Sequence, residues 1–130
     1  MEIQVIELDP EQVKEAPTDD FGFGDKFANR MFIQKYSVAK GWHDAKIGPF
    51  EPLTLSPATA VFHYAQEIFE GTKAYRRPDG NINLFRPWDN MRRFNSSAKR
   101  MAMPVVDEEE HLAAVVQLLE MEHDWVPSKA

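Results

Sequence analysis

The chain has 130 residues, 43% of them hydrophobic, which is enough for one domain with its own core and short for an enzyme with a separate cofactor domain. Its formal net charge of −6 disfavours binding to nucleic acid or to an anionic membrane surface. The absence of cysteine excludes disulfides, thiolate nucleophiles and cysteine-based zinc sites. No apolar run approaches the roughly 18 residues of a membrane span, and the first residues lack a secretion signal, so we expect a cytoplasmic protein without membrane contact.

The N-terminal half is predicted to contain an arm, a strand and a loop. Residues 1–24 mix a few alternating apolar positions with acidic and proline-containing turns, which predicts an extended arm that ends at the glycine-punctuated turn around Phe23. Residues 30–38 are β-formers throughout and predict a strand. Residues 61–69 are a short apolar segment that fits either a helix or a strand. Residues 41–60 are rich in Pro, Gly, Thr and Ser, which predicts an irregular loop pinned by buried Trp42, Ile47, Phe50 and Leu53.

The C-terminal half has stronger local signals. The sequence Arg77-Pro78-Asp79-Gly80 predicts a tight turn, and therefore a β-hairpin, between residues 72–76 and 81–85. Pro87 suits the first turn of a helix, and Asp107 suits the N-cap of a second one that ends near residue 123 or 124. Apolar side chains recur at helical spacing in both segments: Trp88, Met91, Phe94, Ala98 and Met101, then Leu112, Val115, Val116 and Leu119. We therefore expect one α/β (α+β) domain, in which a mainly antiparallel sheet holds the hairpin and both helices pack on the sheet.

Basic residues gather on the first predicted helix of this acidic protein, namely Arg86, Arg92, Arg93, Lys99 and Arg100. The ordinary interpretation is a solvated helix face, because long basic side chains normally lie on the surface. The functional interpretation is an anion site, since a guanidinium forks two hydrogen bonds to a phosphate. Spacing alone does not choose which arginine would bind.

Aromatic side chains between Phe62 and Phe69 allow two interpretations, a core cluster or a pocket wall that satisfies the polar atoms of His63 and Tyr64. A catalytic base at His63 would need a carboxylate or nucleophile that the sequence does not pair with it. We expect no metal site, because His63 and Glu67 lack the further ligands that zinc requires. The glycines near residue 23 lack the third glycine of a nucleotide-binding loop.

The stretch from His63 to Arg76 resembles the HY-x4-FEG-x-KA-(F/Y) signature of branched-chain amino acid aminotransferases, which are fold-type IV pyridoxal-phosphate enzymes. The similarity continues in the family's order through LFRPW (84–88), NMRR (90–93), SA-x-R (97–100) and Met103-Pro104. Upstream it includes FANRM (27–31), and downstream DWVP (124–127). The resemblance therefore covers essentially the whole chain after about residue 20.

This resemblance implies transfer of the amino group of leucine, isoleucine or valine to 2-oxoglutarate by a homodimer that binds pyridoxal 5'-phosphate between two domains. Arg93 matches the arginine that binds the cofactor phosphate, although Arg92 stands where the family often has an acidic residue. Tyr64, Phe69 and Phe23 match side chains that line the substrate pocket. An apolar wall suits a branched aliphatic side chain, and a phenol can orient a carboxylate.

The resemblance also implies that no catalytic residue lies in this fragment, because the family's Schiff-base lysine falls beyond Ala130. Lys73 matches a different lysine of the family. We expect residues 1–20 to be a variable arm and 21–130 the small domain, inactive and without pyridoxal phosphate on its own, and prone to self-association through an apolar surface that includes Phe69 and Trp125. The open alternatives are a free-standing anion or amino-acid binding or dimerisation domain, and another fold-type IV enzyme.

Overall fold

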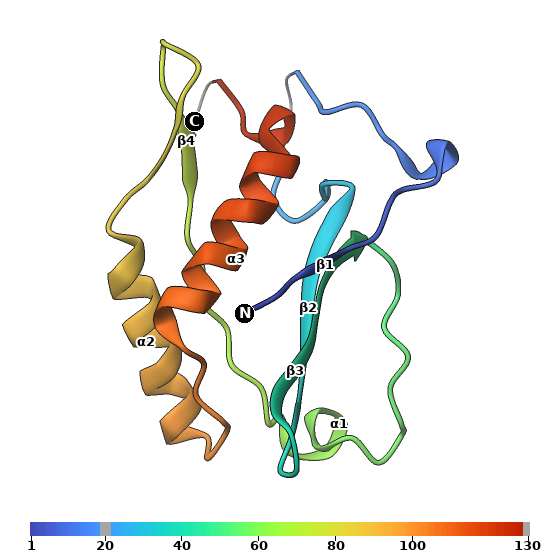
Figure 1. Cartoon of the computed structure of the whole chain (residues 1–130), viewed down its shortest axis with the longest axis vertical. Helices are drawn as coiled ribbons and strands as arrows, with labels where there is room; N and C mark the ends of the chain where they lie inside the picture. The colour runs from blue at the N-terminus through green and yellow to red at the C-terminus, as the bar shows by residue number, and fades with distance from the viewer. Residues whose placement is uncertain (19–21, 129–130) are drawn as a thin grey trace.

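A three-stranded sheet forms one side of the molecule in the computed structural model, which describes residues 1–18 and 22–128 (Figure 1). Its strand order is β1-β3-β2, with bounds β1 (Gln4–Val5), β2 (Arg30–Ser37) and β3 (Gly41–Pro49). β2 and β3 pair antiparallel, whereas the short β1 adds a parallel edge to β3. Within residues 1–18 of the predicted arm, β1 is extended and contributes a strand to the sheet, whereas residues 19–21 lie outside the described part of the chain.

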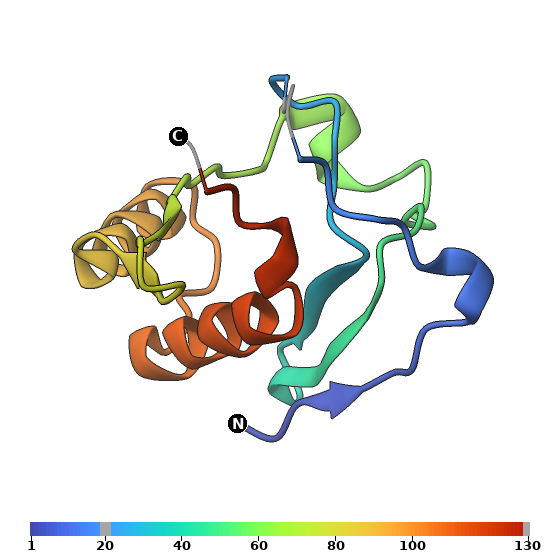
Figure 2. The same ribbon diagram turned by 90° about the horizontal axis from the view of Figure 1, so that it is seen from above.

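Two long helices cover the sheet in successive layers. α3 (Glu108–Met121) contacts β2, and α2 (Pro87–Arg100) packs against the other side of α3, so that α3 lies between α2 and the sheet (Figures 1 and 2). The predicted α+β class is confirmed, and so are both helices. The expectation that both helices pack on the sheet is correct for α3 only. Buried apolar side chains come from all three layers: Ala45 and Ile47 of β3, Met91 and Ala98 of α2, and Leu112 and Ala114 of α3.

The ends of both helices follow from local chemistry. Pro87 occupies the first turn of α2, where a missing N–H costs nothing. The Asp107 side chain accepts a hydrogen bond of 2.9 Å from the Glu110 N–H at the start of α3, as its prediction as an N-cap requires. No helix in the part of the chain that the structure describes is long and apolar enough to cross a membrane.

The predicted hairpin is present as β4 (Ala74–Arg76) and β5 (Ile82–Leu84), joined by a turn in which Gly80 has a φ of 86°. Its expected place in the main sheet is wrong, because β4 and β5 pair only with each other among the described strands. The Arg76 Nε donates a hydrogen bond of 3.0 Å to the carbonyl of Val126. The hairpin is therefore anchored to the segment after α3 and not to the sheet.

The prediction of an irregular loop over residues 41–60 is wrong for its first half, which forms β3. Ile47 is completely buried and lies opposite Phe32 of β2. The glycines and proline that suggested a loop stand at the ends of the strand, at Gly41, Gly48 and Pro49, where they interrupt few ladder hydrogen bonds. Pairing on both sides thus overrides a composition that does not favour a strand.

The side chains expected to pin that loop are mostly exposed. Ile47 is buried, but Trp42, Phe50 and Leu53 are exposed by 36%, 47% and 63%. The Trp42 indole instead donates a hydrogen bond of 2.7 Å to the carbonyl of Val105, in the connection between α2 and α3. Residues 50–59 contain no regular element.

The ambiguous apolar segment over residues 61–69 begins as the short helix α1 (Ala60–Tyr64) and then becomes irregular. Ala65 has a φ of 47°, a left-handed conformation that ends the helix. Two single 3₁₀ turns complete the description, η1 (Pro10–Gln12) in the arm and η2 (His123–Trp125) after α3.

Candidate anion and substrate site

Arg93 lies on α2 with a side chain that is 66% exposed, and it forms a two-pronged ion pair with Glu70. Its Nε donates to Glu70 Oε2 at 2.8 Å, and its Nη2 donates to Glu70 Oε1 at 2.5 Å. Glu70 belongs to the irregular segment before β4. The ion pair therefore joins two parts of the chain that the sequence keeps 23 residues apart.

The Glu70 carboxylate is itself held by several donors. Its side chain is only 9% exposed, and Oε1 also accepts from Asn90 Nδ2 at 3.0 Å and from the Gly71 N–H at 3.1 Å. Asn90 Nδ2 additionally donates to the Gly71 carbonyl at 2.9 Å. The hydrogen bonds from Arg93, followed by that from Asn90, lower the pKa of Glu70 from 4.5 to about 2 against the opposing effect of burial. The carboxylate is thus ionised at neutral pH.

Arg93 borders an open hollow of about 370 Å³ between the start of the hairpin and α2. Lys73, Tyr75, Arg86 and Asp89 also line this hollow. Three of the lining side chains are cations, those of Arg93, Lys73 and Arg86. Arg86 Nε contacts Asp89 Oδ2 at 2.6 Å, so Arg86 is paired with another residue of the same wall. Arg92 is not among the lining residues, and it pairs with Asp89 at 2.9 Å. Geometry thus places Arg93, and not Arg92, at the hollow.

The donors at this hollow are chemically suited to a phosphate group. A guanidinium carries five N–H groups, and the Glu70 carboxylate occupies two of those of Arg93. The three that remain lie on an exposed side chain at the rim of the hollow, with the ammonium of Lys73 in the same wall. The oxygens of a phosphate group match the geometry of such a fork, as those of a carboxylate do.

The three aromatic residues predicted to line a substrate pocket are exposed. The exposed fractions of Tyr64, Phe69 and Phe23 are 82%, 89% and 100%, and none of the three lines the hollow at Arg93. Phe69 borders a different hollow, beside Arg100 and other residues near the C-terminal end of α2, which shares no lining residue with the first. Among the described residues, the four predicted site residues do not meet in one pocket.

The other side chains that could carry chemistry contact backbone or aromatic groups and form no further catalytic cluster among the described residues. His63 Nε2 lies 2.8 Å from the Pro57 carbonyl oxygen, and no carboxylate among the described residues pairs with the ring as base catalysis would require. Lys73 Nζ lies 5.8 Å from the centroid of the Tyr75 ring. No group of three His, Asp or Glu side chains within residues 1–18 and 22–128 could hold a metal ion.

Sequence reasoning missed Glu70 and Asn90 as parts of the site. Both residues lie inside the quoted family stretches, yet nothing in their spacing indicates that they meet. Asn90 and Arg93 share one helix face at a separation of three residues, which is the one local signal available.

Comparison with known proteins reveals close relatives. No protein-family model matches the chain. The branched-chain-amino-acid transaminase 1 of Bacillus subtilis is 50% identical over 117 residues, which are 89% of this chain and 33% of that protein. The branched-chain-amino-acid aminotransferase 2 of the same organism is 40% identical over 95% of the chain and 34% of its own length. A probable branched-chain-amino-acid aminotransferase of Streptomyces coelicolor is 47% identical over 82% of the chain and 30% of its own length.

Identity at this level over most of the chain makes it a homologue of the aminotransferases. The three relatives named above are branched-chain-amino-acid aminotransferases, so the resemblance noted in the sequence is confirmed. The chain spans about a third of the length of the curated relatives it matches.

Proposed function

We propose that residues 21–130 are the small, N-terminal domain of a branched-chain aminotransferase, preceded by an arm over residues 1–20. The complete enzyme would transfer the amino group of leucine, isoleucine or valine to 2-oxoglutarate in the cytoplasm. The observation that carries this proposal is the 50% identity with a branched-chain-amino-acid transaminase over 89% of the chain. No observation favours a free-standing binding domain over this function.

Arg93 would bind the phosphate of pyridoxal 5'-phosphate. The proposal is supported by its exposed guanidinium, its three N–H groups outside the Glu70 pair, and its place at the hollow. When bound, this cofactor supplies the carbonyl group and the electron-accepting ring that amino-group transfer requires. The present chain would contribute binding and orientation, and the Schiff-base lysine would come from the rest of the enzyme.

Tyr64, Phe69 and Phe23 would form part of the wall around the aliphatic substrate. Their exposure supports a wall that is completed by other polypeptide, because an apolar pocket must remove its lining from water to bind an aliphatic side chain. In a homodimer, that cover would come from the larger domain and from the second subunit. The Tyr64 phenol would orient the substrate carboxylate by hydrogen bonding.

The test uses the complete gene product that contains this chain. We expect it to transfer amino groups from leucine, isoleucine and valine to 2-oxoglutarate, and we expect Arg93→Ala to weaken pyridoxal phosphate binding by about a hundredfold, as loss of a charged fork implies. The 130-residue chain alone should show no transfer and no bound cofactor. A complete protein without transaminase activity would overturn the proposal, as would full activity of the isolated chain.

A further inference from the structure

The ion pair between Arg93 and Glu70 is unusual because its two members differ in burial. The arginine is 66% exposed, whereas the carboxylate is 9% exposed and receives four hydrogen bonds from Arg93, Asn90 and the Gly71 N–H. An exposed arginine ordinarily samples many rotamers. The Glu70 carboxylate, which is held by the Gly71 N–H and by Asn90, removes much of the rotamer freedom of Arg93.

The atoms used by this pair determine which donors remain. Glu70 contacts the Nε and Nη2 edge of the guanidinium. Because the group is planar and rigid, its other edge, which carries one hydrogen of Nη1 and the second hydrogen of Nη2, is directed away from Glu70. That edge is the one free to form a second fork at the hollow.

The charge of Glu70 by itself works against anion binding. A carboxylate within hydrogen-bonding distance cancels much of the positive potential of Arg93, so a site built for attraction alone would omit it. The benefit of Glu70 must then be orientation, since a donor that is already in place loses less rotamer freedom when the ligand binds.

We propose that Glu70 is a positioning residue for Arg93, and that its carboxylate, held by Asn90 and Gly71, fixes the guanidinium so that the free edge faces the phosphate of the cofactor. This inference rests on the proposed function, which supplies the phosphate ligand. Glu70 itself does not touch the phosphate in this arrangement.

The experiment measures the dissociation constants of pyridoxal 5'-phosphate and of phosphate-free pyridoxal for the complete apoenzyme. The dissociation constant of pyridoxal divided by that of pyridoxal 5'-phosphate isolates the phosphate contribution, because the ring chemistry is common to both ligands, and this ratio falls when the phosphate is held less well. Glu70→Gln keeps the shape of the side chain but cannot accept from both Nε and Nη2. We expect it to weaken pyridoxal phosphate binding by about tenfold, with less than about a twofold effect on pyridoxal.

Three further variants complete the design. Glu67→Gln makes the same charge change on an exposed side chain three residues earlier and should leave the ratio unchanged. In an Arg93→Ala background, Glu70→Gln should no longer alter the ratio, because the residue through which it acts is gone. If Glu70→Gln does not fold, Asn90→Ala loosens the same carboxylate and should lower the ratio by a smaller factor.

The outcomes separate the two proposals. If Arg93→Ala leaves the ratio unchanged, Arg93 does not bind the phosphate, and both proposals fail. If Arg93→Ala lowers the ratio but Glu70→Gln does not, the phosphate role stands and the positioning role is overturned. Equal weakening of both ligands by Glu70→Gln would likewise overturn it, because Glu70 would then act only on the fold.

Discussion

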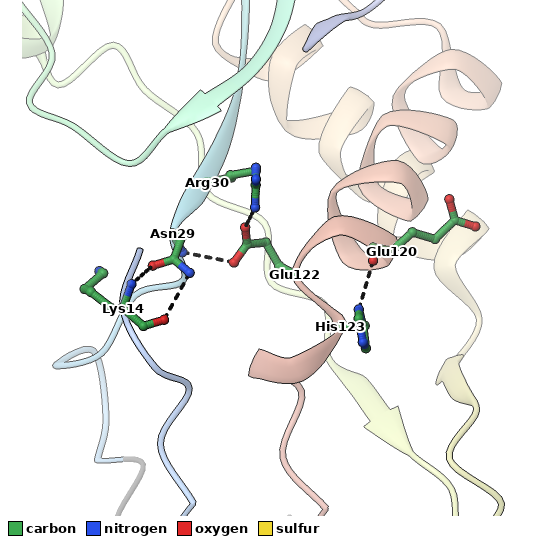
Figure 3. Close-up of polar contacts among 6 residues, drawn as sticks. All are labelled: Lys14, Asn29, Arg30, Glu120, Glu122 and His123. Carbon is green, nitrogen blue, oxygen red and sulfur yellow. Dashed lines mark hydrogen bonds and ion pairs between the residues drawn. The ribbon is translucent and has the colours of Figure 1, made fainter. Parts of the chain in front are cut away.

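Glu122 and Asn29, 93 residues apart in the chain, are joined by a hydrogen bond of 3.0 Å from the Asn29 backbone N to Glu122 Oε2 (Figure 3). The same carboxylate accepts from Arg30 Nη1 at 2.7 Å. The Asn29 side chain in turn accepts from the Lys14 N–H at 2.8 Å and donates to the Lys14 carbonyl at 3.2 Å. This network ties the N-terminal arm and the start of β2 to Glu122, the C-cap residue that follows α3.

Replacement of Glu122 by alanine should destabilise the domain by about 2–4 kcal/mol. The change leaves the Asn29 N–H and the Arg30 guanidinium without their carboxylate partner in a site where Glu122 is only 6% exposed. Chemical denaturation followed by circular dichroism measures the loss. Glu120→Ala, an exposed position two residues earlier, should cost less than about 0.5 kcal/mol. An equal loss of unfolding free energy in the two variants would contradict a stabilising role for the Glu122 network.

Replacement of the buried Asn95 should also lower the stability of the domain. Its side-chain amide donates to the Val106 carbonyl at 2.9 Å and accepts from the Val106 N–H at 2.9 Å, and so it joins α2 to the segment before α3. Asn95→Ala leaves both backbone groups unpaired, which should lower the free energy of unfolding by about 2–3 kcal/mol. The matched control is Ser96→Ala on the exposed side of the same helix, which should be close to neutral. A neutral Asn95→Ala would mean that these hydrogen bonds do not form in solution.

The pair between Glu70 and Arg93 predicts a stability change in acid. The pKa of Glu70 is held at about 2, below its usual 4.5, chiefly by the Arg93 hydrogen bonds, so the unfolded chain takes up the proton first as the pH falls. The contribution of Glu70 is therefore complete above pH 4.5 and is lost progressively toward pH 2. Thermal midpoints of the wild type should fall more steeply over this range than those of Glu70→Gln. Parallel curves would show that the pair does not stabilise the fold.

His111 predicts a second pH dependence, in a different range. Burial lowers the pKa of its imidazole below the usual 6.5, and the ring stacks on Phe94 with centroids 5.3 Å apart. The folded state therefore disfavours the protonated form, so stability is complete above pH 6.5 and decreases as the pH falls below it. His111→Phe keeps the stacking without the titration, and it should flatten the thermal midpoint between pH 7.5 and 5. A wild type with no slope over this range would refute the prediction.

The exposed aromatic surface predicts self-association of the isolated chain. Phe69 is 89% exposed, and a large apolar side chain in water favours burial against a second copy. Sedimentation velocity should detect oligomers at high protein concentration, and Phe69→Ser should reduce them. Val38→Ser, at a position that is 95% exposed in the connection between β2 and β3, serves as the control. A monomer at all concentrations would count against this surface as an interface.

Trp125, expected on the same surface, is in fact half-buried, with Lys14 Nζ 5.5 Å from its ring centroid.

Local elements could be predicted from the sequence because their causes are local. Pro87 and the Asp107 N-cap begin their helices through interactions within one turn, and the Pro78-Asp79-Gly80 turn closes the hairpin through bonds between neighbours. The family resemblance is likewise a property of the sequence alone, and the comparisons confirm it. The residues proposed for phosphate and substrate come from that resemblance and stay predictions.

Tertiary contacts determined the features that the sequence does not encode locally. β3 is a strand because β1 and β2 pair with it on either side and Ile47 enters the core, although the composition of residues 41–49 suggests a loop. Glu70 meets Arg93 only because the segment before β4 lies against α2, and either charge alone could pair with many partners. Caps, turns and helix periodicity act within about four residues and can be read along the chain, whereas pairing across 23 or 93 residues depends on how the layers pack.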